Sequence, residues 1–281
     1  MNLMVVVRML RPGQWVKNAL LFFPPFLAGS FFKQETLIAG LLPFMTLCLA
    51  SSCVYVCNDY LDREQDRFHP GKSRRPVAAG EIGLRGVIGI ISGILLFLIP
   101  LALTQPLTEQ AFLLGYLFLS LLYVLKLRNQ PLIDMFCIAA LFLLRLNYGG
   151  VIFAVSVSSW LFLTVLFLSL FLSAGKRLNE CIELASMATV HRRSLEGYPD
   201  GFLAGTMSLT GAAVLVTYAV YCVSRPLLVY TVPLCCFGLF RILLRTQAGK
   251  GGDPTESLFK DGWLFFVGLI WVVVVGLSIY R

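Results

Sequence analysis

The chain has 281 residues, of which 58% are apolar and 14% are charged, and its net charge is +8. Soluble domains average roughly 45–50% apolar and about 25% charged residues, so this composition excludes both an ordinary soluble enzyme and a disordered chain. It predicts an all-α polytopic membrane protein with a single domain, residues 1–281. The positive charge is not evidence for nucleic acid, because the cytoplasmic loops of membrane proteins are basic, and we expect no nucleic-acid partner.

Nine apolar runs predict about nine transmembrane helices around a central cavity. They cover residues 19–32, 36–57, 82–103, 110–127, 132–154, 158–174, 202–223, 226–244 and 262–280. Most have about the length of ~20 residues that a bilayer requires, whereas the first is short and contains two consecutive prolines. The segments between the runs alternate between short, nearly uncharged turns and long, charged loops.

The charged loops predict the orientation. Of the 23 lysines and arginines, 19 fall in the N-terminus and the long loops, and three fall on the other side. The positive-inside rule therefore predicts a cytoplasmic N-terminus and cytoplasmic long loops, with the C-terminus outside, in the cell (inner) membrane. Most acidic residues also fall on the cytoplasmic side, which that rule does not require, so they need a local explanation.

The strongest local pattern is Asn-Asp-Tyr-Leu-Asp-Arg-Glu-Gln-Asp-Arg at 58–67, directly after an apolar run. If the helix continues, the three aspartates lie at i, i+3 and i+7 on one face, where they repel one another unless a cation lies between them. Hard oxygen ligands on one face suit Mg²⁺, which also bridges to substrate phosphates. The alternative is a solvated helix whose carboxylates pair with neighbouring arginines. The pattern predicts a catalytic magnesium site formed by Asn58, Asp59, Asp62 and Asp66.

Two further cationic segments suggest phosphate binding. The loop at 69–80 carries Lys72, Arg74 and Arg75 beside the aspartates, and guanidinium groups match phosphate oxygens. The segment Gly-Lys-Arg-Leu-Asn-Glu at 175–180 follows another apolar run and places Lys176 and Glu180 at i, i+4. For each segment, ordinary juxtamembrane charge is the alternative.

Arg145 differs from the other cations because it lies inside an apolar run. It follows Asp134 by eleven residues, so it is about 16 Å deep at 1.5 Å per residue. An arginine at that depth faces a polar cavity or a partner, which makes it a candidate functional residue. Asp134 is too distant along the helix for a direct ion pair.

These motifs, in this order, resemble the UbiA superfamily of intramembrane prenyltransferases, and within it most of all the decaprenyl-phosphate phosphoribosyltransferase branch. The resemblance lies in segments 11–18, 58–80, 127–134 and 175–180. The chain departs from that branch at Arg128, where we expect lysine, and at 146–148, where we expect small residues.

The resemblance implies a donor, an acceptor and a cofactor. The donor is 5-phosphoribose 1-diphosphate, the acceptor is a polyprenyl phosphate in the membrane, and Mg²⁺ on the aspartates binds the departing diphosphate. The acceptor oxygen is already ionised, so no general base is needed, and the product would enter cell-wall arabinan synthesis. The implied substrate-binding residues are Arg11, Lys17, Asn18, Asn58, Lys72, Arg74, Arg75, Tyr123, Lys126, Arg128, Asp134, Arg145, Lys176, Arg177 and Glu180.

Two alternatives remain open. A UbiA enzyme that transfers a prenyl group to an aromatic ring would carry a second aspartate cluster, whereas Lys176 and Arg177 suit an additional phosphate. A membrane transporter would concentrate its polar features near the bilayer midplane, whereas here they gather at the cytoplasmic mouth.

Overall fold

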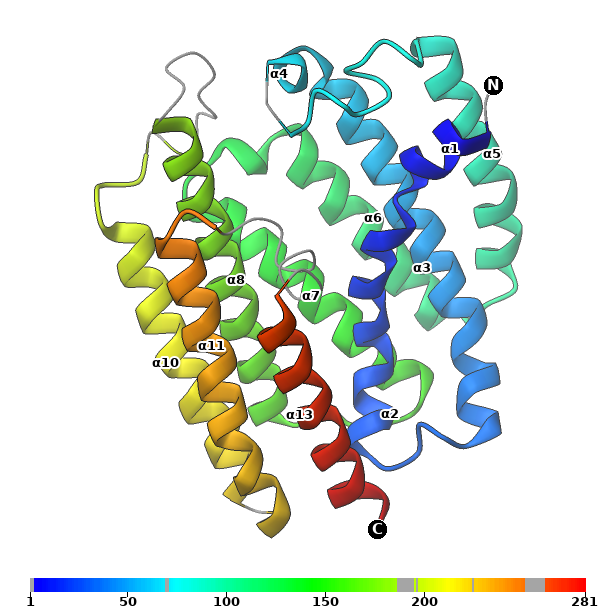
Figure 1. The fold of residues 1–281 in the computed structure, drawn as a ribbon. Coiled ribbons are helices and arrows are strands. Elements are labelled where there is room, and N and C mark those ends of the chain that lie inside the picture. Colours follow the sequence, from blue (N-terminus) through cyan, green and yellow to red (C-terminus); the bar gives the residue numbers. More distant parts are fainter. Residues whose placement is uncertain (1–2, 69–70, 186–194, 196, 224, 251–260) are drawn as a thin grey trace.

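The computed structural model describes residues 3–68, 71–185, 195, 197–223, 225–250 and 261–281. Every regular element in these ranges is helical (Figure 1). In chain order the elements are α1 (Leu3–Leu10), η1 (Pro12–Phe22), α2 (Phe23–Leu27), α3 (Gln34–Leu61), α4 (Arg63–Arg67), α5 (Leu84–Leu103), α6 (Leu107–Leu125), η2 (Leu127–Asn129), α7 (Ile133–Ile152), α8 (Ser159–Ala185), α10 (Phe202–Val223), η3 (Pro226–Thr231), α11 (Val232–Gln247) and α13 (Gly262–Tyr280).

The predicted all-α membrane fold is confirmed, with one difference in the first span. Eight helical segments in the described ranges are long and apolar enough to cross a bilayer, and the first of them is α3. The run at 19–32 instead forms the end of the 3₁₀ helix η1 and the five-residue helix α2. Pro12, Pro24 and Pro25 lack backbone N–H donors, which explains why no long regular α-helix forms there. This segment still runs the length of the bundle beside α3 (Figure 1).

Helices α3 and α8 are longer than the hydrocarbon core of a bilayer is thick, and their C-terminal ends carry the charged motifs. They have 28 and 27 residues, so each is about 40 Å long, compared with about 30 Å for the hydrocarbon core. The C-terminal end of α8 lies at the same end of the bundle as α4 and the N-terminus, whereas the C-terminus lies at the opposite end (Figure 1). The fold therefore brings the 58–67 and 175–180 motifs to one end.

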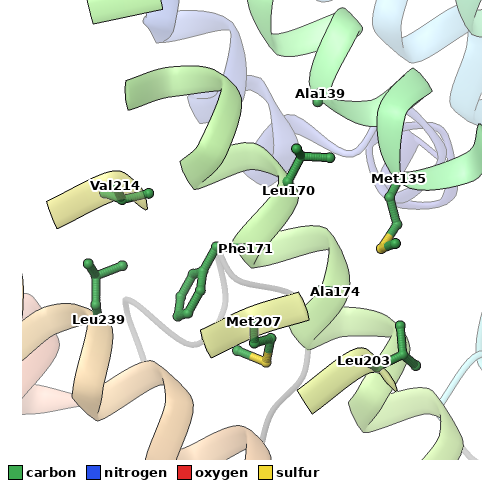
Figure 2. Close-up of a cluster of buried hydrophobic side chains, with 9 residues drawn as sticks. All are labelled: Met135, Ala139, Leu170, Phe171, Ala174, Leu203, Met207, Val214 and Leu239. Atoms are coloured by element: carbon green, nitrogen blue, oxygen red, sulfur yellow. The ribbon is translucent and has the colours of Figure 1, made fainter. Parts of the chain in front are cut away.

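A buried apolar cluster sets the spacing of the helices below this end. It is formed by α7, α8, α10 and α11, through Met135, Ala139, Leu170, Phe171, Ala174, Leu203, Met207, Val214 and Leu239. Figure 2 shows Phe171 among side chains of the neighbouring helices, including Met207 and Leu239. Met135 directly follows Asp134, and Ala174 precedes Arg177 by three residues. Packing of this cluster thereby places the side chains of Asp134 and Arg177 opposite each other.

Candidate active site

Asp59 and Asp66 share one arginine. Asp59 lies in the last turn of α3 and Asp66 lies in α4, and both are buried, with 1% and 4% of their surface exposed. Nη1 of Arg75 lies 3.1 Å from Oδ1 of Asp59 and 2.6 Å from Oδ2 of Asp66. The repulsion expected between neighbouring carboxylates is therefore relieved by a guanidinium group from the 71–83 loop.

Arg11 also binds Asp59, from a strained backbone position. Its Nη2 donates a hydrogen bond to Oδ1 of Asp59. Arg11 has φ 52° and ψ 57°, the left-handed region that costs a non-glycine residue energy and that is often associated with functional sites. Close by, Arg8 of α1 donates hydrogen bonds to Glu81 at 3.1 Å and to the carbonyl of Arg74 at 2.6 Å. Helix α1 thus holds the cationic loop over the aspartates.

Asp62 and Asn58 both contact Arg128. Nη1 of Arg128 donates to Oδ1 of Asn58 at 3.0 Å and to Oδ2 of Asp62 at 2.7 Å. This confirms that residues 58 and 62 are neighbours on one helix face. The condition under which all three aspartates would share one helix face is not met, because α3 ends at Leu61 and Asp62 has φ −91° and ψ 0°. A new short helix then carries Asp66.

Each of the three aspartates forms an ion pair with an arginine, so the cluster does not resemble a metal site made of carboxylates alone. Among the described residues, no group of three or more His, Cys, Asp or Glu could by itself hold a metal ion. Mg²⁺, however, is usually bound by one or two carboxylates together with substrate phosphates and water, so an all-protein cage is not required. The carboxylates therefore fit a Mg²⁺ ion that is held jointly with a diphosphate.

A second buried cluster joins α6, α7 and α8. Asp134 is fully buried, and its Oδ2 accepts a hydrogen bond from Nε of Arg177 at 2.6 Å. Arg177 also donates to Glu180 at 2.7 Å and to the hydroxyl of Tyr123 at 3.0 Å. Arg177 thus contacts three other predicted substrate-binding residues, Asp134, Glu180 and Tyr123. Arg177 is only 1% exposed, and its positive charge is balanced by two carboxylates, those of Asp134 and Glu180.

Arg145 lies in a separate polar cage inside the bundle. Its Nε donates to Oδ1 of Asn18 at 2.9 Å, its Nη1 to the carbonyl of Leu141 at 2.8 Å and its Nη2 to the hydroxyl of Tyr116 at 3.0 Å. Arg145 and Asp134 form no ion pair, because they lie eleven residues apart on α7, and Asp134 pairs with Arg177 instead. The predicted polar environment of Arg145 is therefore present, and Asn18 of η1 is part of it.

The other predicted binding residues lie at the surface or at its edge. Arg74 and Lys126 are exposed, whereas Lys17, Lys72 and Lys176 are partly buried.

Sequence reasoning missed Tyr116 as a partner of Arg145. Tyr116, Ser120 and Tyr123 follow the spacing i, i+4 and i+7, which is a stripe of hydroxyl groups along one face of the apolar helix α6. That stripe is a signal from which the role of Tyr116 could have been found.

An apolar cavity of about 310 Å³ lies among α2, α8, α10, η3, α11 and α13. Its walls include Phe23, Leu161, Tyr218 and Trp271, and almost none of its surface is polar. Its apolar lining therefore suits a hydrocarbon group.

The sequence matches the model of the UbiA prenyltransferase family over residues 22–277. The chain belongs to the UbiA prenyltransferase family. Its fold agrees with solved members: a UbiA homologue from Archaeoglobus fulgidus, bound to DMAPP and Mg²⁺, aligns with a TM-score of 0.70 at 18% identity and covers 98% of each chain.

Two curated relatives of this UbiA-family chain carry a more specific name. A decaprenyl-phosphate phosphoribosyltransferase from Corynebacterium glutamicum is 30% identical over 98% of this chain and 86% of its own length. A protein of the same name from Mycolicibacterium smegmatis is 30% identical over 98% of this chain and 92% of its own length. The chain is similar to both from end to end, so their names provide a hypothesis for its reaction.

Proposed function

We propose that the protein transfers the 5-phosphoribosyl group of 5-phosphoribose 1-diphosphate to a polyprenyl phosphate. An oxygen of the acceptor phosphate forms a bond to the anomeric carbon, and the bond from that carbon to the diphosphate breaks, with its electron pair leaving on the diphosphate. The acceptor oxygen is already ionised, so no proton has to be removed. Attack from the face opposite the diphosphate inverts the anomeric centre.

The interleaving of aspartates and arginines is the observation that carries this proposal. Three carboxylates, on Asp59, Asp62 and Asp66, face three guanidinium groups, on Arg11, Arg75 and Arg128. A magnesium diphosphate offers a partner to each kind of group: the cation suits the carboxylates, and the phosphate oxygens suit the arginines. When bound, Mg²⁺ would neutralise negative charge on the leaving diphosphate.

The names of the curated relatives support phosphoribose as the transferred group. The second motif also fits this reading better than transfer of a prenyl group to an aromatic ring. In the described part of α8, the end of the helix carries Lys176 and Arg177 with the carboxylate of Glu180, rather than an aspartate cluster. The apolar cavity supports a lipid acceptor, since it suits a hydrocarbon chain.

The remaining predicted residues have proposed roles in substrate binding. Arg11, Arg75 and Arg128 exchange their carboxylate partners for diphosphate oxygens, while Lys17, Lys72, Arg74, Lys126 and Lys176 add positive potential around the mouth. Asp134, Tyr123 and Glu180 hold Arg177, and Asn18 holds Arg145.

The proposed orientation has the aspartate cluster and the N-terminus on the cytoplasmic side. Alkaline phosphatase fused after Arg281 is therefore expected to be active outside the cell membrane.

Transfer can be measured directly on purified protein in detergent. The assay contains Mg²⁺, a polyprenyl phosphate and 5-phosphoribose 1-diphosphate labelled in the ribose, and the lipid is then extracted. We expect label in the organic phase, and none after chelation of Mg²⁺. Absence of labelled lipid, together with transfer from dimethylallyl diphosphate to an aromatic acceptor, would overturn the proposal in favour of prenyl transfer.

A further inference from the structure

The two buried arginines of the described chain have different electrostatic surroundings. Arg177 is 1% exposed and pairs with two carboxylates, those of Asp134 and Glu180. Arg145 is 5% exposed, and its hydrogen-bond partners, an amide, a carbonyl and a phenol, are all neutral. Within the described ranges no carboxylate forms an ion pair with Arg145. This buried charge is therefore not balanced by the protein.

An unbalanced buried charge is costly, and the surroundings of Arg145 offset the cost only in part. A guanidinium group removed from water loses its hydration energy, which hydrogen bonds to neutral groups recover incompletely. The rings of Tyr116 and Phe142 lie 4.7 and 5.5 Å from its central carbon, and their faces add a modest attraction. Residues of this kind inside membrane spans usually mark substrate or ion pathways.

Ser120 provides a second observation at the same place. It lies on the hydroxyl stripe of α6, between Tyr116, which accepts from Arg145, and Tyr123, which accepts from Arg177. Ser120 is 2% exposed, and its Oγ lies within reach of the Tyr116 hydroxyl but forms no hydrogen bond of good geometry. Buried hydroxyl groups in native proteins are nearly always fully paired, so one that lacks a well-formed hydrogen bond between two arginine-bound tyrosines can still bind a ligand.

This place is distinct from the aspartate cluster. Asn18, which holds Arg145, also donates to Ser51 of α3 at 3.1 Å. Ser51 precedes Asp59 by eight residues, which is about 12 Å along the helix. A group bound beside Arg145 is therefore not the group held at Asp59.

We infer that Arg145 and Ser120 bind the phosphomonoester group of a substrate. Such a group carries nearly two negative charges at neutral pH and has several strong acceptor oxygens, so it supplies both the missing charge and a partner for the serine hydroxyl. The inference rests on the proposed function, in which each substrate carries one such group: the phosphate of the polyprenyl acceptor and the 5-phosphate of the donor.

Binding can be measured without the reaction, in detergent and without Mg²⁺. The probes are farnesyl phosphate, farnesol and ribose 5-phosphate, and the variants are Arg145→Met and Ser120→Ala. Loss of a charge-assisted hydrogen bond predicts a Kd about 10- to 100-fold higher for Arg145→Met with one of the two phosphates, and an unchanged Kd for farnesol. Ser120→Ala should raise the same Kd about 3- to 10-fold with little loss of thermal stability, because the hydroxyl makes no hydrogen bond of good geometry in the free protein.

The two phosphate probes identify the source of the group. Weaker binding of farnesyl phosphate assigns the site to the acceptor, and weaker binding of ribose 5-phosphate assigns it to the donor. Arg85→Met, which removes an exposed arginine of α5, is the matched control and should leave every Kd unchanged. Wild-type affinity of both Arg145→Met and Ser120→Ala for both phosphates would overturn the inference. The binding assay tests the inference separately from the proposed function, because it involves neither the donor diphosphate nor transfer. If Arg145→Met does not fold, the affinity of Ser120→Ala for the two phosphates decides whether the inference holds.

Discussion

The backbone N–H of Leu132 donates a hydrogen bond to the hydroxyl oxygen of Tyr198 at 2.7 Å, and that hydroxyl donates to Oδ1 of Asp134 at 2.8 Å. Leu132 has φ 64° and ψ −51°, and the N–H of Ile133 bonds to the carbonyl of Pro131 at 2.7 Å, which is a strained γ-turn. Burial raises the pKa of Tyr198, so the hydroxyl keeps the proton that it donates. Tyr198 therefore stabilises the strained turn at Leu132, which lies in the chain between Arg128 and Asp134.

Tyr198→Phe is expected to release this turn. The variant keeps the aromatic ring but leaves the Leu132 N–H and the Asp134 carboxylate each without one partner, so it should destabilise the protein by about 1–3 kcal/mol. Thermal unfolding in detergent measures this change. Adding Leu132→Gly should restore part of the stability, because glycine adopts positive φ without strain. Strictly additive effects of the two substitutions would contradict the role of Tyr198 in holding the turn.

Asp62→Asn should nearly abolish magnesium-dependent transfer. The substitution removes one carboxylate charge from the proposed site, and loss of several kcal/mol of charge stabilisation corresponds to a rate at least about 100-fold lower. Asp59→Asn and Asp66→Asn should act in the same direction. The measurement is labelled lipid formed at increasing Mg²⁺ concentration, with Glu35→Gln, an exposed acid at the far end of α3, as the control. Full activity of Asp62→Asn would show that the metal assignment is wrong.

Lys176→Ala should raise the apparent KM for the donor by about tenfold, because it removes a charged partner for a phosphate. The value of kcat should change less, since Lys176 is proposed to bind substrate rather than the leaving group. Lys33→Ala, which removes an exposed lysine before α3, serves as the control. A donor KM equal to that of the wild type would remove Lys176 from the donor site.

Gly149→Ala should destabilise the bundle, because a Cβ at this position would lie 1.9 Å from the carbonyl oxygen of Leu21. Helix α7 thus contacts η1 through backbone, and relief of the clash requires a shift that costs about 1–3 kcal/mol or more. Gly115→Ala on α6 is the control, since its Cβ would meet no atom within 4 Å, and there alanine should stabilise the helix by about 0.5–1 kcal/mol. Thermal unfolding of the two variants should therefore shift in opposite directions, and equal stability of Gly149→Ala and the wild type would contradict the close approach.

Much of the architecture could be predicted from local sequence. Apolar runs of sufficient length predict spanning helices because the bilayer leaves a backbone few ways to satisfy its hydrogen bonds, and eight of the nine runs form such segments. The exception is the run with Pro24 and Pro25, where missing N–H donors favour irregular helix. The neighbouring positions of Asn58 and Asp62 also followed from helical periodicity alone, and both contact Arg128.

The sequence by itself thus determined the membrane fold, the neighbouring positions of Asn58 and Asp62 and the placement of Arg145 within a spanning helix, because each depends on hydrophobicity or on the period of one helix. Only the tertiary structure decided which charges meet. Arg75 lies between Asp59 and Asp66, Arg177 takes Asp134 as its partner, and Arg145 is left with neutral groups. These pairings join residues from different helices and loops, and their distances depend on how the helices pack, which no pattern within one segment specifies.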